Sequence, residues 1–273
     1  MALVEMQHIS KAFGAVQALE DVSLYVNPGE VLGIVGDNAA GKSTLMKILS
    51  GAYRADSGTI TMNYAPVIIG SPEDSRRLGI EMVYQDLALA NNLDVISNLY
   101  LGQELSTRKI GPFRLLDRKA MRAGADGLIA RLGIAIPDPT QDVEHLSGGQ
   151  RQAVAVGRAM LFDAKLVIMD EPTAALSLSA VDQVLRLIGQ LKRRRIAVIL
   201  ISHRLDDVIA AADRVVVLRQ GRVVAQRIMI KNRVDEFRQT LLADMEGIAR
   251  ADKDTGLREL RPVSGASCGV TPI

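Results

Sequence analysis

The feature that most constrains the fold of this chain is the segment GDNAAGKST, residues 36–44, together with the stretches on either side of it. The apolar run VLGIV, Val31 to Val35, directly precedes it and predicts a buried strand. The run LMKILSG directly follows it and predicts a helix that ends at Gly51. The segment is therefore predicted to be a turn from a strand into a helix, as α/β folds use.

The same segment fits the pattern G-x-x-x-x-G-K-[S/T] of a phosphate-binding loop. Its glycines let successive backbone N–H groups point inward, and the following helix adds its positive end, so a triphosphate meets donors already aimed at it. We expect Lys42 to reach the β- and γ-phosphates, Ser43 to offer its hydroxyl to Mg²⁺, and Thr44 to donate near the α-phosphate. The predicted nucleotide-binding residues are Gly36, Asp37, Asn38, Ala39, Ala40, Gly41, Lys42, Ser43 and Thr44. The alternative is a glycine-rich turn that merely packs.

The amino-acid composition limits the classes of protein to which this chain can belong. A chain of 273 residues, 48% hydrophobic and 23% charged, can bury a core and is not disordered for most of its length. A net charge of +2 is too small to predict nucleic-acid binding, and the basic run Lys192 to Arg195 is interpreted as the end of a helix. Cys268 is the single cysteine, which excludes a disulfide framework and favours a reducing, intracellular compartment. No apolar run approaches the roughly 18 residues that span a bilayer, so we expect any membrane span to come from a partner.

Further elements are predicted on both sides of the turn. The alternating runs LVEMQHI, VSLYV and GTITM predict antiparallel strands around Val31 to Val35. The apolar runs LVIMD, AVILIS and RVVVL predict buried strands, and a helix separates the first two. That helix is expected to bury one face, formed by Val181, Val184, Leu185, Ile188 and Leu191. Strands that alternate with helices predict a mostly parallel sheet.

The domain organisation follows from these patterns. Residues 1–248 are predicted to form one domain, with a helical subdomain at about 86–162. In that subdomain Asp117 is expected to cap a helix that Gly133 ends. Residues 249–273 are polar and then rich in Ser, Gly and Pro, which predicts a flexible tail.

The run LVIMDE places two acids at the carboxyl end of a predicted strand, where open α/β sheets bind ligands. We expect Asp170 to hold Mg²⁺ through water. Glu171 points to the other side of the pleat and is a candidate general base for the attacking water. Acids at a strand end are often only helix caps, and it is the pairing with the phosphate loop that favours a catalytic role.

The segment LSGGQ, Leu146 to Gln150, carries a second candidate phosphate site. Ser147 and Gln150 fit a capping box for the helix that follows. Capping does not explain Gly148 and Gly149, which weaken a first turn but let a phosphate approach the helix N-terminus. One chain cannot easily offer two helix N-termini to one nucleotide, so we expect this helix to serve the nucleotide of a second copy.

With these motifs the chain resembles the ATP-binding cassette (ABC) ATPases. GDNAAGKST, the Gln85 of VYQ, LSGGQRQ, LVIMDEP and the His203 of LISH occur in the order of that family, over about Leu3 to Asp244. The resemblance implies an α/β, P-loop NTPase fold with a mixed, mostly parallel core sheet, an antiparallel β subdomain and a helical subdomain. It also implies a head-to-tail pair of cassettes, with ATP between the phosphate loop of one and the LSGGQ segment of the other.

The resemblance implies roles for further residues. Gln85 would contact Mg²⁺ and couple hydrolysis to transport, His203 would contact the γ-phosphate, and Phe13 would stack on adenine. From the residues alone, Gln85 is an ordinary polar residue after a strand, and Phe13 could simply pack an edge strand. After the second acid the family usually continues S-A-L-D, whereas this chain has A-A-L-S, ending at Ser177. That departure puts communication between the two sites in doubt, although serine is also a good N-cap.

Within the family, the stretch GIEMVYQDLALANNLDVISNLYLG and the insertion GPFRLLDRKAM resemble the ATPase subunits of bacterial monosaccharide importers of the ribose, xylose and fructose type. A single cassette implies a homodimer. It would lie peripherally on the cytoplasmic face of the inner membrane, under integral-membrane permease subunits that receive cargo from a periplasmic sugar-binding protein. Residues 86–100 would form the groove for the permease, or else local core.

Two alternatives remain. One is a soluble cassette that clamps nucleic acid or a protein-assembly partner. The sequence lacks the strongly basic face that a nucleic-acid clamp needs, so we expect no nucleic-acid partner. The other is a nucleotide-gated binding module with little turnover, against which Glu171 and His203 argue.

Overall fold

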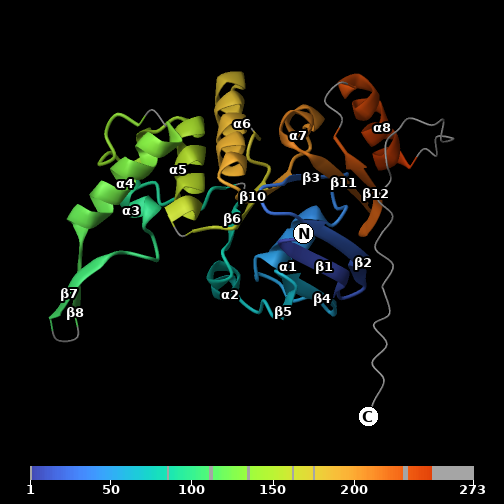
Figure 1. Cartoon of the computed structure of the whole chain (residues 1–273), viewed down its shortest axis with the longest axis horizontal. Helices are drawn as coiled ribbons and strands as arrows, with labels where there is room; N and C mark the ends of the chain where they lie inside the picture. The colour runs from blue at the N-terminus through green and yellow to red at the C-terminus, as the bar shows by residue number, and fades with distance from the viewer. Residues whose placement is uncertain are drawn as a thin grey trace, which may run out of the picture.

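The computed structural model describes residues 2–84, 86–110, 113–133, 136–161, 163–174, 176–229 and 233–247. Across these ranges the chain forms a six-stranded sheet, a four-stranded sheet and a two-stranded hairpin, with helices around them (Figure 1). Within the same ranges, no helix combines the length and the apolar character needed to cross a bilayer.

The six-stranded sheet is the core of the molecule. Its strands lie in the order β12-β11-β3-β10-β9-β6, and all neighbouring pairs are parallel except β11 with β12. They span Val31–Val35 (β3), Ile80–Val83 (β6), Leu166–Asp170 (β9), Ala197–Ile201 (β10), Arg214–Arg219 (β11) and Arg222–Ile228 (β12). Strands β3 and β10 are buried along their whole length, as expected for parallel strands covered on both faces. The prediction of a mixed, mostly parallel sheet is confirmed.

The second sheet is antiparallel, in the order β2-β1-β4-β5. Its strands are Val4–Phe13 (β1), Val16–Val26 (β2), Ser57–Met62 (β4) and Ala65–Val67 (β5). The antiparallel strands are as predicted, but the expectation that they surround Val31 to Val35 is wrong. Strand β3 pairs with β10 and β11 in the other sheet, and it meets the antiparallel sheet only through one face, where Leu32 and Ile34 pack with Met6 and Val22.

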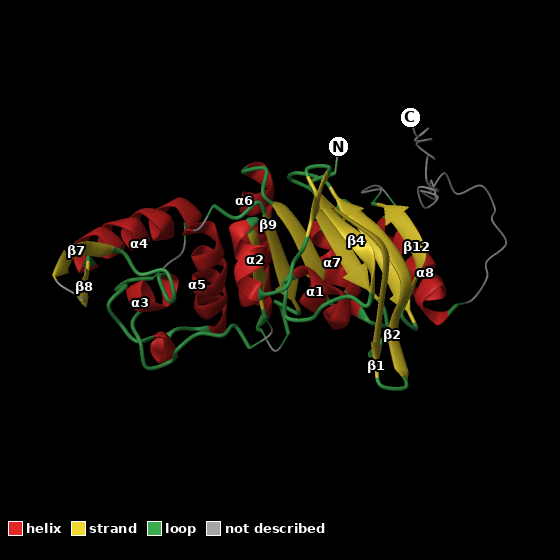
Figure 2. Ribbon diagram, turned by 90° about the horizontal axis from the view of Figure 1, so that it is seen from below, coloured by secondary structure: helices red, strands yellow, loops and turns green. Residues whose placement is uncertain are grey.

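Helices cover the opposite face of the core sheet. Val31 and Val35 of β3 belong to the hydrophobic core on that face, together with helix side chains such as Val184 and Val208, and Figure 2 shows helices beside the sheet. The helices of the described residues are Lys42–Leu49 (α1), Pro72–Arg77 (α2), Val95–Leu99 (α3), Arg118–Leu132 (α4), Gly148–Leu161 (α5), Leu178–Arg193 (α6), Leu205–Ala211 (α7) and Val234–Glu246 (α8), with a 3₁₀ turn at Val143–His145. Helix α1 is an exception to this placement, because its Leu45 and Met46 pack with Leu32 and Ile34 on the side of the antiparallel sheet. On α6, Leu187 is buried where Leu185 was expected, and Leu185 is only half-buried.

The segment between β6 and β9 forms a group of helices beside the core sheet (Figure 1). In it, Asp117 caps α4 by accepting a hydrogen bond from Ala120 N at 2.9 Å, and Gly133 ends the helix with φ +58°, as predicted. The hairpin Ser106–Ile110 (β7) and Phe113–Leu116 (β8) was not predicted. Residues 248–273 and Phe162 lie outside the described residues, so the boundaries at 162 and 248 and the flexible tail remain predictions.

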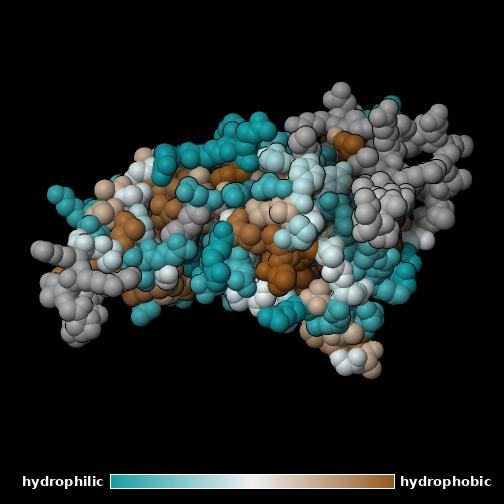
Figure 3. Space-filling view, turned by 60° about the horizontal axis from the view of Figure 1, so that its bottom comes forward, coloured by the Kyte–Doolittle hydropathy of each residue, from teal (hydrophilic) through white to brown (hydrophobic). Residues whose placement is uncertain are grey.

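Apolar surface is unevenly distributed over the molecule. On the face in Figure 3, hydrophobic side chains gather in the middle and toward the α3–α5 side, with hydrophilic side chains between them. Of the apolar residues expected for a groove at 86–100, Val95 and Ile96 are buried in the core, whereas Leu87 and Leu89 are only partly buried.

The two sheets are joined by the buried side chain of Arg214. Its guanidinium donates to Glu30 Oε1 at 2.7 Å, to the Tyr25 carbonyl at 2.6 Å and to Gln226 Oε1 at 3.1 Å. We expect Arg214→Met to lower the free energy of unfolding by about 3 kcal/mol, because it leaves the Glu30 carboxylate buried without its partner. Arg214→Lys should not restore stability, because one ammonium cannot reach three separated acceptors.

Urea denaturation measures this loss. The matched control is Arg222→Met, because Arg222 pairs with Glu20 where both side chains are about half exposed. It should change the free energy of unfolding by less than about 1 kcal/mol. Equal losses in the two variants would contradict a structural role for the buried arginine.

Candidate active site

Three neighbouring parallel strands end at one edge of the core sheet, and each is followed by candidate site residues. Strand β3 leads into the phosphate loop, β9 ends in Asp170 and Glu171, and β10 is followed by His203. Because the carboxyl ends of parallel strands meet at one edge, residues that are far apart in sequence come together there.

Two glycines shape the phosphate loop. Gly36 has φ +150° and Gly41 has φ +101°, both unfavourable for other residues. A Cβ on Gly36 would lie 2.1 Å from the Leu218 carbonyl oxygen, and one on Gly41 would lie 2.7 Å from the Ala18 carbonyl oxygen. The predicted turn from strand to helix is therefore confirmed, with α1 beginning at Lys42.

The Lys42 side chain lies back over the loop. Its Nζ donates to the carbonyl oxygens of Gly36 at 2.7 Å and Asp37 at 2.8 Å, and the residue is only 9% exposed. Burial lowers the pKa of Lys42, while the carboxylates of Glu171, Asp170 and Asp37 act in the opposite direction. The loop therefore holds a desolvated ammonium group, which can exchange carbonyl acceptors for phosphate oxygens.

Ser43 at the start of α1 and Asp170 at the end of β9 are brought close enough together for the Ser43 hydroxyl to stabilise the Asp170 carboxylate. Burial raises the pKa of the Asp170 carboxyl, and the nearby Glu171 charge raises it further, while the Ser43 hydroxyl opposes the shift. A bound cation would offset the cost of this buried negative charge. A hydroxyl and a carboxylate are the oxygen donors that Mg²⁺ prefers, so this pair fits the ion.

Glu171 and His203 form the next contact along the same edge. His203 Nδ1 lies 2.7 Å from Glu171 Oε2, and the His203 N–H donates to the same oxygen at 3.3 Å. The Glu171 backbone has φ +52° and is held by its N–H donating to the Ile201 carbonyl at 2.9 Å. A left-handed backbone conformation is costly in a glutamate, so the surrounding contacts must hold it in place. The side chain is therefore oriented by its neighbours, as a general base requires.

The LSGGQ segment begins α5, and both views place α5 apart from α1 (Figures 1 and 2). The capping box is present: Gln150 N donates to Ser147 Oγ at 3.3 Å, and Ser147 N donates to Gln150 Oε1 at 2.9 Å. A Cβ on Gly149 would lie 2.5 Å from Gln183 Oε1 of α6, and one on Gly148 would lie 2.8 Å from Leu176 Cδ2. Both atoms are the ends of flexible side chains that can move aside, so packing within the chain does not by itself require glycine at these two positions.

Comparison with known proteins decides the family. The model of the family described as ABC transporter matches residues 19–174. The chain belongs to this family. Its fold, an α/β ABC ATPase fold with a mixed core sheet and an antiparallel sheet, is similar to that of the ADP conformation of an ATP-binding cassette of an ABC transporter. The TM-score is 0.77 at 25% identity, covering 90% of this chain and 99% of the other.

Several curated ABC proteins are similar to this cassette over most of its length. It is 44% identical to a xylose/arabinose import ATP-binding protein of Sulfolobus acidocaldarius, covering 88% of this chain and 93% of the relative. It is 43% identical to a fructose import ATP-binding protein of Rhizobium meliloti, covering 87% and 91%. It is 39% identical to a ribose import ATP-binding protein of Burkholderia cenocepacia over 86% of this chain but 46% of the relative, so the cassette spans about half of that protein. The chain is an ATP-binding ABC transporter ATPase.

The structure gives different outcomes for three further residues that the sequence suggests for the site, Phe13, Gln85 and Ser177. Phe13 is 43% exposed at the end of β1, with its ring edge-to-face on Tyr53 at 5.2 Å, so packing and adenine stacking are both open to it. Gln85 lies outside the described residues. Ser177 occupies the N-cap position of α6, but its Oγ contacts Ser179 Oγ at 3.2 Å and caps no backbone N–H.

Sequence reasoning missed a buried contact beside the sheet edge that carries the candidate site residues. Thr173 Oγ1 donates to Asp207 Oδ2 at 2.6 Å, and Arg204 Nε lies 3.3 Å from the same oxygen. This contact ties the loop after Glu171 to the first turn of α7, the helix that begins two residues after His203. No spacing in the sequence indicates it, because the partners are 34 residues apart and meet only in the folded sheet.

Proposed function

We propose that this ABC ATPase hydrolyses ATP to drive the import of a monosaccharide. The observation that supports this most directly is the similarity to two import ATP-binding proteins, one for xylose/arabinose and one for fructose, at 43–44% identity over about nine-tenths of each relative. The chain and both relatives thus match along nearly their whole lengths, in contrast to the ribose proteins that are about twice as long.

In the proposed site, the phosphate loop and Lys42 bind the triphosphate of ATP. Ser43 and Asp170 would hold Mg²⁺ together with Gln85, and the ion would neutralise charge on the phosphates. Glu171 accepts the proton of the attacking water, and His203 keeps the Glu171 carboxylate in place and lies where it can contact the γ-phosphate. Phe13 stacks on the adenine.

The proposal includes a homodimer in which each nucleotide lies between the phosphate loop of one copy and Ser147, Gly148, Gly149 and Gln150 of the other. The separation of α5 from α1 within one chain supports this arrangement. A dimeric ABC transporter cassette of solved structure shares the fold, with a TM-score of 0.69 at 20% identity.

The dimer would lie on the cytoplasmic face of the inner membrane against two permease subunits, and a periplasmic sugar-binding protein would deliver the cargo to them. Large apolar side chains are exposed around the β7–β8 hairpin, at Leu101, Leu105, Leu115 and Leu116. Exposed apolar groups in one region are typical of contact surfaces for partners.

Purification of the tagged full-length protein from its native membranes tests the proposal. We expect permease subunits with several membrane spans to co-purify, and the reconstituted complex to hydrolyse ATP faster when a sugar-loaded binding protein is added. Co-purification of a nucleic-acid enzyme in place of a permease would instead support the soluble cassette. Stimulation by a solute that is not a sugar would overturn the cargo class.

Mixing two variants tests the shared site. Ser147→Arg blocks the LSGGQ segment, and Lys42→Ala disables the phosphate loop, so each homodimer should be inactive. A mixed dimer holds one site in which both halves are intact. An equal mixture should therefore recover about a quarter of the wild-type turnover, measured as phosphate release, if the sites act independently. Activity no higher than that of the separate variants would contradict the head-to-tail arrangement.

A further inference from the structure

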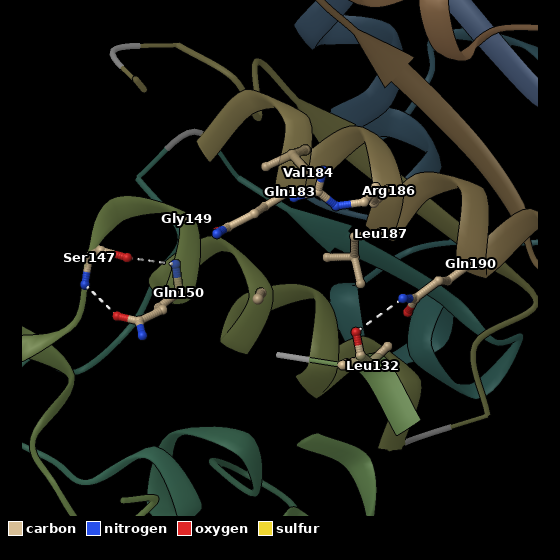
Figure 4. Close-up of a pocket in the computed structure, with 11 residues that line it drawn as sticks. Leu132, Ser147, Gly149, Gln150, Gln183, Val184, Arg186, Leu187 and Gln190 are labelled. Atoms are coloured by element: carbon tan, nitrogen blue, oxygen red, sulfur yellow. Dashed lines mark hydrogen bonds between the residues drawn. The ribbon is translucent and has the colours of Figure 1, made fainter. Parts of the chain in front are cut away.

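A cavity of about 280 Å³ lies between α4, α5 and α6 (Figure 4). One end is formed by the start of α5, including Ser147 and Gly149 of the LSGGQ segment, and the other by the end of α4 and the middle of α6. The cavity is therefore distinct from the phosphate loop, none of whose residues lines it. Its Ser147 end belongs to the segment proposed to contact the nucleotide of a second copy, but the proposed ATPase cycle assigns no role to the end formed by Leu132, Leu187 and Gln190.

The lining of this cavity combines an apolar floor with amide groups and one cation. Leu132, Ala153 and Leu187 supply apolar surface. Arg186 is exposed at the rim and forms no ion pair with any described residue. Among the described lining residues there is no aspartate or glutamate, so the Arg186 guanidinium is the one charged group that this lining offers to a ligand.

Gln190 leaves one polar atom unsatisfied. Its Nε2 donates to the Leu132 carbonyl at 3.0 Å, the contact drawn as a dashed line in Figure 4. Its Oε1 is buried and accepts no hydrogen bond in the described part of the chain. A buried acceptor without a donor is costly, and a hydroxyl group of a bound molecule would supply one.

We propose that this cavity binds a small polyhydroxylated anion of the monosaccharide phosphate class, a step that rests on the proposed role in sugar import. Its volume of about 280 Å³ is just below the range of roughly 300–1,000 Å³ for small-molecule sites, which favours a ligand smaller than a nucleotide. The guanidinium of Arg186 suits a phosphate, and the amides of Gln183 and Gln190 suit hydroxyls. A sugar without a phosphate would make no charge-assisted contact with Arg186. Inorganic phosphate alone would be too small to reach the glutamine amides and the apolar floor as well. Phosphoryl transfer to an imported sugar produces this class of compound.

The position of the cavity gives such a ligand control over the ATPase. Helices α4 and α5 belong to the group of helices beside the core sheet, whereas α6 connects β9 to β10 and so belongs to the core. A ligand between them fixes α5, and with it Ser147, relative to the core. In the proposed dimer that segment faces the nucleotide of the other copy, so ligand binding and ATP sandwich formation are coupled, and each changes the affinity of the other by the same factor.

Isothermal titration calorimetry on the full-length protein tests the proposal, with ADP kept saturating so that the phosphate loop is filled. The probes are ribose 5-phosphate and fructose 6-phosphate, and the controls are ribose, fructose and inorganic phosphate. We expect saturable binding of at least one sugar phosphate, at least about tenfold tighter than that of its sugar or of phosphate alone. No saturable binding of either sugar phosphate, binding lost when ADP is present, or equal binding of inorganic phosphate would overturn the proposal.

Two variants locate the binding. Arg186→Gln should weaken it roughly tenfold or more, because a charge-assisted hydrogen bond is lost. Arg193→Gln makes the same change on an exposed residue near the end of α6 that does not line the cavity, and it should leave the affinity unchanged. Ala153→Met should abolish binding by filling the cavity. Equal affinities in Arg186→Gln and Arg193→Gln would overturn the assignment, whether or not Ala153→Met folds. Co-purification of a permease is measured separately, so failure of this inference is distinguishable from failure of the proposed import function.

Discussion

Replacement of Glu171 by glutamine should lower ATP turnover by about a thousandfold, within the range that general bases contribute. The amide cannot accept the proton of the attacking water, yet it keeps the size of the side chain and can still accept a hydrogen bond from the His203 backbone N–H. ATP should therefore still bind and hold the dimer closed, because the groups that contact the phosphates are unchanged. Steady-state phosphate release measures the turnover, and size-exclusion chromatography with ATP measures the trapped dimer.

The matched control for this variant is Glu144→Gln, which removes a carboxylate whose side chain is 59% exposed in the turn before the LSGGQ segment. It should leave turnover nearly unchanged. Normal turnover by a monomeric Glu171→Gln protein would contradict both the assignment of the base and the dimer.

Replacement of Lys42 by alanine should weaken ATP binding by about a hundredfold, since each charge-assisted hydrogen bond to phosphate contributes roughly 1.5–3 kcal/mol. The ammonium is buried and lies among the carboxylates of Asp37, Asp170 and Glu171. Loss of the ammonium group removes its expected contact with the phosphates. It also leaves the three carboxylates without a nearby positive charge, so they repel the triphosphate.

Equilibrium titration with a fluorescent ATP analogue measures this change. Lys47→Ala, which removes the same charge from the last turn of the same helix, is the comparison variant and should have a much smaller effect. An unchanged dissociation constant in Lys42→Ala would refute the contact with the phosphates.

The features predicted correctly from the sequence are those whose physical causes are local. The turn from β3 to α1, the cap of α4 at Asp117 and its end at Gly133, and the capping box of Ser147 and Gln150 all depend on residues within a few positions of one another. Backbone conformation and capping are decided over such short spans, so spacing alone identifies them.

Tertiary structure decided everything that depends on which segments pack together. The contact of Glu171 with His203, the pairing of Ser43 with Asp170 and the buried bond between Thr173 and Asp207 arise from the order of strands in the core sheet. The spacing of residues in the sequence does not indicate the order of the strands. It also does not indicate that β3 lies in a different sheet from the antiparallel strands. The sequence alone was enough to predict the phosphate loop, the helix caps and the alternation of strands and helices, because each of these depends on residues close together in the chain. The contacts among distant side chains, and the cavity beside α6, were decided by packing, because they exist only once the helices and sheets bury their apolar faces against one another.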